Sequence, residues 1–398
     1  MKPLLLWVVA ALVASLVAGC APQTEPLQTQ EPELPAAYRE TPASTFPTDL
    51  GTIDHVEAEG GRIVAARYQD AALTLLESDG TRLWSRQFPG MMITSVKLAP
   101  SGDRVFVSLL PPSMVGIAQA VWFDESGTAL WQREADLKGG MYDANIAENG
   151  RALALYVLPS GLESSGLPAF ELVDDSGQTS WEAEPAEGAV VCVRSSLNLE
   201  RHAVTMDSRS APSDETPAST TIVRYEDGRQ AMRHVTAGVP TTVYLDESGS
   251  KLLSVADGVE LSLQSLDSTT ALWQTRGDFV SHAVISEDGS TLLTAGFSST
   301  QLGDETTYVV ELALRDMESG ELIWETRREG DSGCWPSTNA NLTRITLVPW
   351  SSGQPSLLFE RSGSEWRSWS LPSQMRAAGF TPEGHLILGS ADGSIALY

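Results

Sequence analysis

The chain has 398 residues, of which 52 are acidic and 26 are basic, so its formal net charge at pH 7 is −26. This charge argues against nucleic acids and anionic membrane surfaces as partners, because both would repel the protein. The 33 glycines and 22 prolines fall largely in short turn clusters, which is typical of a fold made of many strands.

The first 20 residues have the pattern of an export signal that ends in a cysteine. Lys2 supplies a positive charge, residues 4–17 are apolar, and small residues lead up to Cys20. The apolar run is too short and wrongly flanked for a durable membrane span. The arrangement resembles the lipobox of bacterial lipoproteins, a family in which this cysteine is acylated and becomes the first residue of the mature chain.

That resemblance implies a signal peptide over residues 1–19 and a Cys20 that carries fatty acyl chains such as palmitate, which hold an extracytoplasmic protein on a membrane. Because Ala21 follows Cys20, it also implies the outer membrane in a cell with two membranes, and the outer face of the membrane in a cell with one. Residues 20–35 are rich in Pro, Gln and Glu and predict a disordered tether.

From residue 36 to residue 398 a strand–turn–strand unit recurs. Residues 72–88 show it most clearly, with alternating apolar side chains, a turn at Asp79 and Gly80, and Trp84 in the second strand. Further copies occupy residues 120–135, 170–184, 221–235, 261–276 and 311–327. The tryptophan position is held, in chain order, by Trp84, Trp131, Trp181, Met232, Trp273 and Trp324, at spacings of 47, 50, 51, 41 and 51 residues.

Two more strands precede each of these hairpins, so each unit has four strands. A period in the forties with four short strands per unit is typical of a β-propeller. A seventh copy at residues 356–371 has Trp366 or Trp369 at the tryptophan position, and the register there stays open.

The last segment, residues 375–398, has three strands and lacks a fourth. Propellers commonly close by borrowing a strand from the opposite end of the chain, which removes two exposed sheet edges. Residues 36–41, with Tyr38 at the tryptophan position, are the predicted donor. We therefore predict an all-β fold of eight four-stranded antiparallel blades, the last closed by an N-terminal strand, with seven blades as the alternative.

The tryptophans are expected to pack as wedges between neighbouring blades. A tryptophan buries on the order of 200 Å² and usually needs an acceptor for its N–H group. The predicted structural anchors between blades are Trp84, Trp131, Trp181, Trp273, Trp324 and Trp369.

Asp124, Gly127 and Trp131 have a spacing that recurs in residues 174–181. It resembles the tryptophan-docking repeats of the quinoprotein alcohol dehydrogenase-like (PQQ-like repeat) propellers, which have eight blades, and the resemblance covers residues 36–398. That family contains dehydrogenases as well as the non-catalytic lipoprotein that helps to assemble outer-membrane β-barrels. The resemblance therefore implies the fold without fixing the chemistry.

Dehydrogenases of that family hold their quinone beneath a ring of adjacent cysteines, with a calcium ion and a catalytic aspartate. Here the remaining cysteines, Cys192 and Cys334, are far apart in sequence, and they form either one disulfide or two buried thiols. We therefore predict no catalytic residue, no cofactor and no enzyme activity.

The five histidines are His55, His202, His234, His282 and His385, and none has metal-ligand spacing. We therefore predict no metal site. His55 and His282 fall on predicted innermost strands, where a side chain can face a central channel, although an ordinary strand position explains each of them better. The acidic turns at residues 124–125, 174–175 and 287–288 lack the regular oxygen spacing of a calcium loop, so turn chemistry explains them better.

Four insertions, at residues 110–119, 160–168, 208–219 and 298–306, fall between the second and third strands of their blades and should emerge on one face. They are either tolerated surface decoration or loops that carry function. The leading hypothesis is a monomeric, non-catalytic, lipid-anchored scaffold of the cell envelope that engages a protein or peptide through a propeller face. The alternative is a receptor for a small ligand or glycan, or an enzyme, with a site in the central channel.

Overall fold

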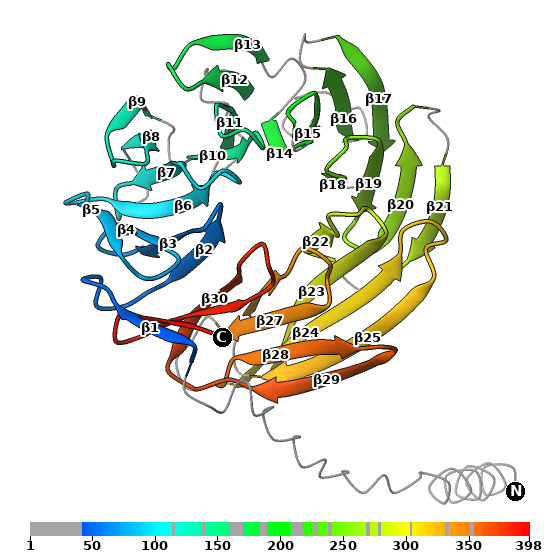
Figure 1. Cartoon of the computed structure of the whole chain (residues 1–398). Helices are drawn as coiled ribbons and strands as arrows, with labels where there is room; N and C mark the ends of the chain where they lie inside the picture. The colour runs from blue at the N-terminus through cyan, green and yellow to red at the C-terminus, as the bar shows by residue number, and fades with distance from the viewer. Residues whose placement is uncertain are drawn as a thin grey trace, which may run out of the picture. The chain divides into compact units, whose positions relative to one another are not determined.

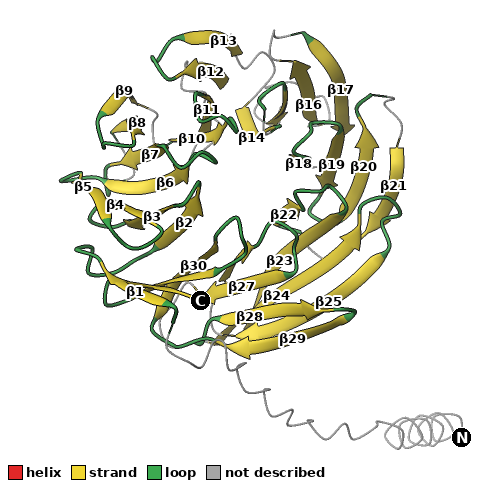
Figure 2. Cartoon of the chain, in the orientation of Figure 1, coloured by secondary structure: helices red, strands yellow, loops and turns green. Residues whose placement is uncertain are grey.

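The computed structural model describes residues 42–113, 116–136, 140–158, 170–183, 189–196, 198–207, 218–225, 229–237, 241–267, 271–277, 280–302, 305–330, 334–349 and 354–398. All of them belong to the compact unit Leu34–Tyr398. The regular elements in these ranges are β-strands (Figure 2), and none of the residues in them forms a helix that would span a bilayer.

The strands form eight four-stranded antiparallel sheets that follow one another around a ring (Figure 1), so the predicted eight-bladed propeller is confirmed and the seven-bladed alternative is wrong. Blade 1 contains β2 (His55–Glu59), β3 (Arg62–Arg67), β4 (Ala72–Glu77) and β5 (Arg82–Gln87); blade 2 contains β6 (Met92–Leu98), β7 (Arg104–Leu110), β8 (Ile117–Asp124) and β9 (Ala129–Asp136). Blade 3 contains β10 (Met141–Ile146), β11 (Ala152–Leu158), β12 (Phe170–Asp174) and β13 (Thr179–Ala183); blade 4 contains β14 (Ala189–Ser195), β15 (Arg201–Asp207), β16 (Ala218–Tyr225) and β17 (Gln230–Ala237).

Blade 5 contains β18 (Thr241–Leu245), β19 (Lys251–Ala256), β20 (Glu260–Ser265) and β21 (Ala271–Arg276); blade 6 contains β22 (His282–Ile285), β23 (Thr291–Leu302), β24 (Glu305–Asp316) and β25 (Leu322–Gly330). Blade 7 contains β26 (Cys334–Thr338), β27 (Arg344–Pro349), β28 (Leu357–Ser362) and β29 (Glu365–Ser370); blade 8 contains β30 (Met375–Phe380), β31 (Leu386–Ser390), β32 (Ser394–Leu397) and β1 (Ser44–Pro47). The recurring hairpin of the sequence is therefore the outer pair of strands in each blade.

The ring is closed by β1, which pairs with β32 so that Ser44 lies opposite Leu397 and Phe46 opposite Ile395. This corrects the predicted donor, residues 36–41, which lie outside the described residues. The aromatic residue of the closing strand is Phe46 rather than Tyr38. Phe46 lies against Gly80 of blade 1, as the tryptophans of other blades lie against a glycine of the blade that follows them.

The apolar core lies between blades, because each sheet buries both of its faces against its neighbours. Between blades 1 and 2, for example, Val64 and Leu75 of one sheet pack with Val96 and Val107 of the other. Similar clusters join blade 8 to blade 1 and blade 7 to blade 8. The innermost strand of each blade therefore has a fixed height and direction in the ring.

The two faces of the propeller are built differently. The AB face carries the turns that join the first strand to the second and the third strand to the fourth in each blade. The BC face carries the connections from the second strand to the third and the connections between blades. The predicted insertions all fall on second-to-third connections, as expected. Residues 298–306, however, largely extend a hairpin: β23 and β24 pair from Thr291 with Asp316 out to Leu302 with Glu305.

The acidic turns of the AB face are closed by their own hydrogen bonds. Oδ1 of Asp124 accepts hydrogen bonds from the backbone N–H groups of Ser126 and Thr128, both at 2.9 Å. Oδ1 of Asp174 accepts equivalent bonds from Ser176 and Gln178, also at 2.9 Å. The turn role predicted for these residues is thereby confirmed.

Candidate functional site

Three of the predicted anchors lie against the outer-turn glycine of the next blade: Trp84 against Gly127, Trp131 against Gly177 and Trp273 against Gly320. Each of these glycines has a positive φ, between 75° and 81°. A Cβ atom at Gly127 would lie only 2.7 Å from Cγ of Trp84. Glycine is therefore favoured at these positions for two reasons: the backbone has a positive φ, and the indole ring leaves no room for a Cβ atom.

The other anchors contact the next blade in different ways. Trp181 packs beside Phe170 and the buried His202 of blade 4, with ring centroids 5.0 and 6.2 Å away. Met232 packs with the apolar cluster between blades 4 and 5, which includes Val243 and Leu252. These contacts place both residues at an interface between blades.

Blade 7 divides the tryptophan position between two residues. Trp366 stacks on Trp324 of blade 6 with centroids 4.4 Å apart, where other blades present a glycine. Trp369 pairs with Leu358 in the ladder, is 5 % exposed, and packs with Met375 and Leu388 of blade 8.

The expected indole hydrogen bond is present at one anchor and absent at two. Nε1 of Trp273 donates to the carbonyl oxygen of Met317 at 3.0 Å. Nε1 of Trp84 and of Trp131 are buried and have no acceptor among the described residues. The expectation is therefore wrong for Trp84 and Trp131, whose rings are held by apolar contacts.

The cysteines are placed as follows. Cys20 lies outside the described residues, as does the side chain of Cys192 on β14. Cys334 is a buried free thiol at the start of β26, and burial raises its pKa to about 12. A thiol with this pKa is almost entirely protonated near neutral pH and is a poor nucleophile.

The inner strands enclose a central cavity of about 1220 Å³ that opens toward the BC face. Its lining includes Asp54, His55 and Tyr68 of blade 1, and Arg376 of blade 8. His55 lies on the innermost strand as predicted, stacks on Tyr68 with centroids 6.1 Å apart, and has Nε2 3.5 Å from Oε2 of Glu57. These groups can bind a polar ligand by stacking and hydrogen bonding.

A smaller cavity of about 240 Å³ lies toward the AB face and shares Glu57, Glu59 and Lys97 with the larger one. Among the described residues, no group of three or more His, Cys, Asp or Glu side chains is arranged to hold a metal ion. The two cavities therefore belong to one polar channel with two mouths.

The AB mouth of this channel is strongly acidic. Burial, and then the charges of Glu57, Glu287, Glu383 and Glu247, raise the pKa of Glu59 to about 7. Burial and neighbouring carboxylates also raise the pKa of Glu247 to about 6. These glutamates come from blades 1, 5, 6 and 8, so ring closure brings together acids that are far apart in sequence.

Elsewhere in the channel, His282 lies near positive charges. His282, on the innermost strand of blade 6 as predicted, has a pKa lowered to about 4, first by burial and then by the positive charges of Arg194 and Lys97. Those cations belong to blades 4 and 2. Sequence reasoning missed this pattern, because the inner-strand position they occupy holds a different residue type in almost every blade.

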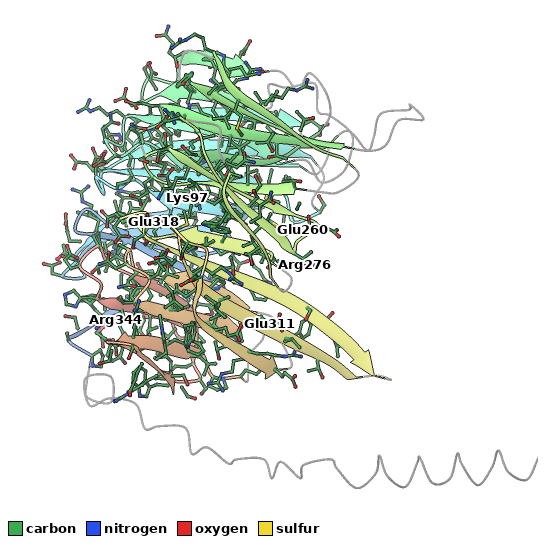
Figure 3. The ribbon with its side chains drawn as sticks, turned by 90° about the vertical axis from the view of Figure 1, so that its right-hand side faces the viewer. Lys97, Glu260, Arg276, Glu311, Glu318 and Arg344 are labelled. Atoms are coloured by element: carbon green, nitrogen blue, oxygen red, sulfur yellow. The ribbon has the colours of Figure 1, made fainter. Side chains whose placement is uncertain are left out.

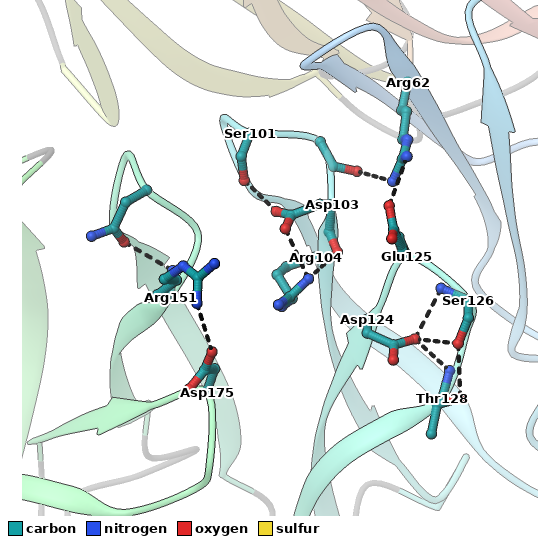
Figure 4. Close-up of polar contacts among 12 residues, drawn as sticks. Arg62, Ser101, Asp103, Arg104, Asp124, Glu125, Ser126, Thr128, Arg151 and Asp175 are labelled. Atoms are coloured by element: carbon teal, nitrogen blue, oxygen red, sulfur yellow. Dashed lines mark hydrogen bonds and ion pairs between the residues drawn. The ribbon is translucent and has the colours of Figure 1, made fainter.

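Sequence reasoning also missed a basic residue at the start of the second strand of several blades. Its side chain joins that blade to the next one on the AB face. Arg62 donates to the carbonyl oxygen of Gly102 at 3.4 Å and to Oε2 of Glu125 at 3.0 Å (Figure 4). Equivalent bonds reach the next blade's turn carbonyl from Arg201, Lys251 and Arg344, which contact Gly249, Gly289 and Gly384 respectively. The signal was present in the sequence as a basic residue just after most first turns.

Comparisons with known proteins show the fold. No protein-family model matches the sequence, and no curated protein matches it by sequence. BamB from Moraxella catarrhalis has a similar structure. The two chains are 13% identical with a TM-score of 0.53, over 90% of this chain and 98% of that one. A chain of the mitotic checkpoint complex, 12% identical over 90% of this chain and 94% of that one, has a TM-score of 0.46, too low to indicate function.

Proposed function

We propose that this protein is a lipid-anchored scaffold of the cell envelope, which acts as a monomer, without catalysis, and binds a protein or peptide partner through its BC face. The proposal rests on the asymmetry between the two faces. Described turns on the AB face are short, and many are closed by their own hydrogen bonds and by cations from the neighbouring blade. The BC face carries the long connections, and loops on a rigid frame commonly carry binding residues.

The β23–β24 hairpin is the observation that carries this proposal. Each of its strands has 12 residues, the longest in the described parts of the chain. Figure 3 shows this hairpin projecting on the side where Glu260, Arg276 and Glu311 lie, away from Glu318 and Arg344. Ile117, which follows the second-to-third connection of blade 2, is 47 % exposed, and so adds an apolar contact point to the BC face.

The lipid anchor is tested separately from the partner. Cys20→Ser removes the acylated thiol, and we expect the protein to leave the membrane fraction for the soluble fraction, because the folded unit has no other anchor in this proposal. A matched change, Cys192→Ser, should leave the protein in the membrane fraction. Persistent membrane binding of the Cys20→Ser protein would show that the lipobox assignment is wrong.

The partner face is tested by placing a photo-crosslinking residue at single exposed positions in the native cell. Thr307, near the tip of the β23–β24 hairpin, and Ile117 report on the BC face; Glu318 and Glu125 are exposed controls on the AB face. We expect one discrete crosslinked product from Thr307 and Ile117 and none from the controls. Products from the AB controls alone would assign the partner to the other face and overturn the proposal.

The large channel cavity supports a second candidate, a receptor for a small ligand that uses His55, Tyr68 and their polar neighbours. A ligand that binds only the folded state raises the melting temperature by mass action. A thermal-shift screen with glycans, metals and cofactors distinguishes this candidate from the scaffold, which predicts no stabilisation by them.

A further inference from the structure

Two innermost strands contain a β-bulge whose extra residue lines the larger channel cavity. The ladder of β30 and β31 passes from Met375 to Ala377 and leaves out Arg376. The ladder of β6 and β7 leaves out Thr94 in the same way. Both extra residues line the cavity of about 1220 Å³, one on each side of blade 1. Bulges are common next to binding sites, because they turn a side chain in a new direction.

Between the two bulges, blade 1 presents an aromatic ring to the cavity. The backbone N–H of Tyr68 donates to Oδ2 of Asp54 at 2.9 Å, and its carbonyl oxygen accepts a hydrogen bond from the N–H of Ile93 in blade 2, also at 2.9 Å. The ring of Tyr68 stacks on His55 with centroids 6.1 Å apart. Two blades therefore hold the backbone of Tyr68, and its side chain lines the cavity.

Arg376 and Asp54 lie at a similar height on neighbouring innermost strands. A Cβ atom at Gly379 of blade 8 would lie 2.9 Å from the carbonyl oxygen of Val56 in blade 1, so these two positions are side by side. Innermost strands run from the BC face to the AB face, so Arg376 and Asp54, a few residues earlier in each blade, lie nearer the BC mouth. No ion pair joins these two side chains, although both line the cavity.

The polar groups at this end of the channel have unused hydrogen-bonding capacity. Arg376 is half-buried and has no ion-pair or hydrogen-bond partner among the described residues. The hydroxyl of Tyr68 has no hydrogen-bond partner among them either. Asp54 is exposed and uses Oδ2 for the backbone of Tyr68. A ligand therefore meets donors on Arg376 and Tyr68 and an acceptor on Asp54.

The lining of the cavity combines both signs of charge with an apolar wall. Four Asp or Glu side chains and three Lys or Arg side chains line it, and Arg67 lies 3.5 Å from Asp70. A charged ligand of either sign would lie close to like charges, whereas a neutral ligand would not. Pro336, Val348 and Pro349 of blade 7 add apolar contact area. Most small-molecule pockets enclose roughly 300–1,000 Å³, so this cavity has room for more than one ring.

We propose that this end of the channel binds a neutral carbohydrate, with a sugar ring on Tyr68 and sugar hydroxyl groups between Arg376 and Asp54. The C–H face of a sugar ring suits the negative face of an aromatic ring, and its hydroxyl groups both donate and accept hydrogen bonds. The proposal rests on the second candidate function, the small-ligand receptor, and names the ligand class. It does not depend on the scaffold function.

The test is isothermal titration calorimetry of the full-length acylated protein in an amine oxide detergent, which has no sugar headgroup to compete. The probes are three neutral trisaccharides, cellotriose, maltotriose and tri-N-acetylchitotriose, and two charged ones, trigalacturonate and the glucosamine trimer. We expect at least one neutral probe to bind with a dissociation constant of about 1 mM or lower, and more tightly than either charged probe.

Two outcomes would overturn the proposal: no binding of any neutral trisaccharide at millimolar concentration, or charged trisaccharides that bind as tightly as neutral ones. The thermal-shift screen separates this failure from failure of the receptor function itself. If a metal or cofactor stabilises the protein and no saccharide binds, the channel is a receptor for another ligand class.

Variants assign the binding to these residues. Arg376→Gln should weaken binding about tenfold or more, the expected loss for one charged hydrogen bond. Tyr68→Leu should weaken it by a similar factor, and Tyr68→Phe, which keeps the aromatic face, should bind more tightly than Tyr68→Leu. Arg276→Gln changes an exposed arginine outside the channel and should leave binding unchanged. Equal affinities for the wild-type, Arg376→Gln and Tyr68→Leu proteins, all folded by circular dichroism, would place the ligand elsewhere.

Discussion

Gly127 lies directly against the indole ring of Trp84, so close that a Cβ atom there would be 2.7 Å from Cγ of the ring. Gly127 also has a φ of 77°. Gly127→Ala therefore combines backbone strain with a steric clash, and we expect it to lower the free energy of unfolding by about 2–4 kcal/mol. Urea denaturation followed by tryptophan fluorescence measures the change.

Gly90 provides the matched control. Its φ is 76°, almost the same as that of Gly127, but a Cβ atom there would meet nothing within 4 Å. Gly90→Ala should therefore cost only the backbone term, about 1 kcal/mol. If the two variants lost equal stability, the contact between Gly127 and Trp84 would have no role in joining blades 1 and 2.

Phe46 is expected to hold the closing strand on blade 1. It is 9 % exposed and packs with Ile53 and Ile395 at the junction of the first and last blades. Phe46→Ala should lower the free energy of unfolding by about 3 kcal/mol, within the range for large core aromatics. Thr45→Ala, at an exposed site on the same strand, should change it by less than about 0.5 kcal/mol. Similar values for both would mean that the strand is not anchored by Phe46.

Arg201 links blade 4 to blade 5 through two contacts. Its guanidinium donates to the carbonyl oxygen of Gly249 at 2.8 Å and to Oδ1 of Asp267 at 2.7 Å. Because its side chain is 20% exposed, Arg201→Gln should cost about 1–2 kcal/mol of unfolding free energy. Arg276→Gln, at an exposed arginine, should cost almost nothing. Thermal denaturation of both variants and the wild type decides whether these cations stabilise the junctions.

The acidic AB mouth predicts a dependence of stability on pH. The pKa of Glu59 is raised to about 7 in the folded protein from an ordinary value near 4.5, so the folded state binds this proton more tightly than the unfolded state. Its contribution to stability is therefore present at low pH and is lost as pH rises through 7. Glu59→Gln should flatten the fall in melting temperature between pH 5 and pH 8, as a neutral side chain does not titrate.

Two comparisons make the pH measurement specific. Glu318→Gln, at an exposed turn, should keep the wild-type slope. His202 has a pKa lowered to about 4 by burial, which lowers stability as pH falls from about 6.5 toward 4. All proteins contain His202, so its effect cancels when the variants are compared at the same pH. A Glu59→Gln protein with the wild-type slope would show that Glu59 is not the titrating group.

The sequence predicted the architecture because one physical requirement repeats in it. Most outer turns contain a glycine, and a large side chain must fill the gap to the next blade, so pairs such as Gly80 and Trp84 recur at nearly constant spacing. The closing strand was misplaced because β1 has only four residues, with Phe46 as the only aromatic. Four residues contain too little pattern to distinguish them from residues 36–41.

The channel was less predictable, for a different reason. Inner-strand residues such as Glu57 and Lys97 line the cavity inside the ring, where no repeated contact restricts the residue type. Their proximity depends on the register of each blade and on closure of the whole ring, which a local sequence pattern does not contain. In blade 7 the division of roles between Trp366 and Trp369 was likewise decided by the ladder of β28 and β29.

Closure of the ring underlies the placement of both faces and both channel mouths, so it is the claim to test most directly. Thr45 and Ser394 lie on the paired strands β1 and β32, two ladder positions apart. In a Thr45→Cys, Ser394→Cys protein, a short bismaleimide should join the two cysteines rapidly, as mass spectrometry of the digested protein would show. Thr45→Cys with Glu318→Cys should give no product. Failure of the first pair to crosslink at a rate above the second would contradict a closed eight-bladed propeller.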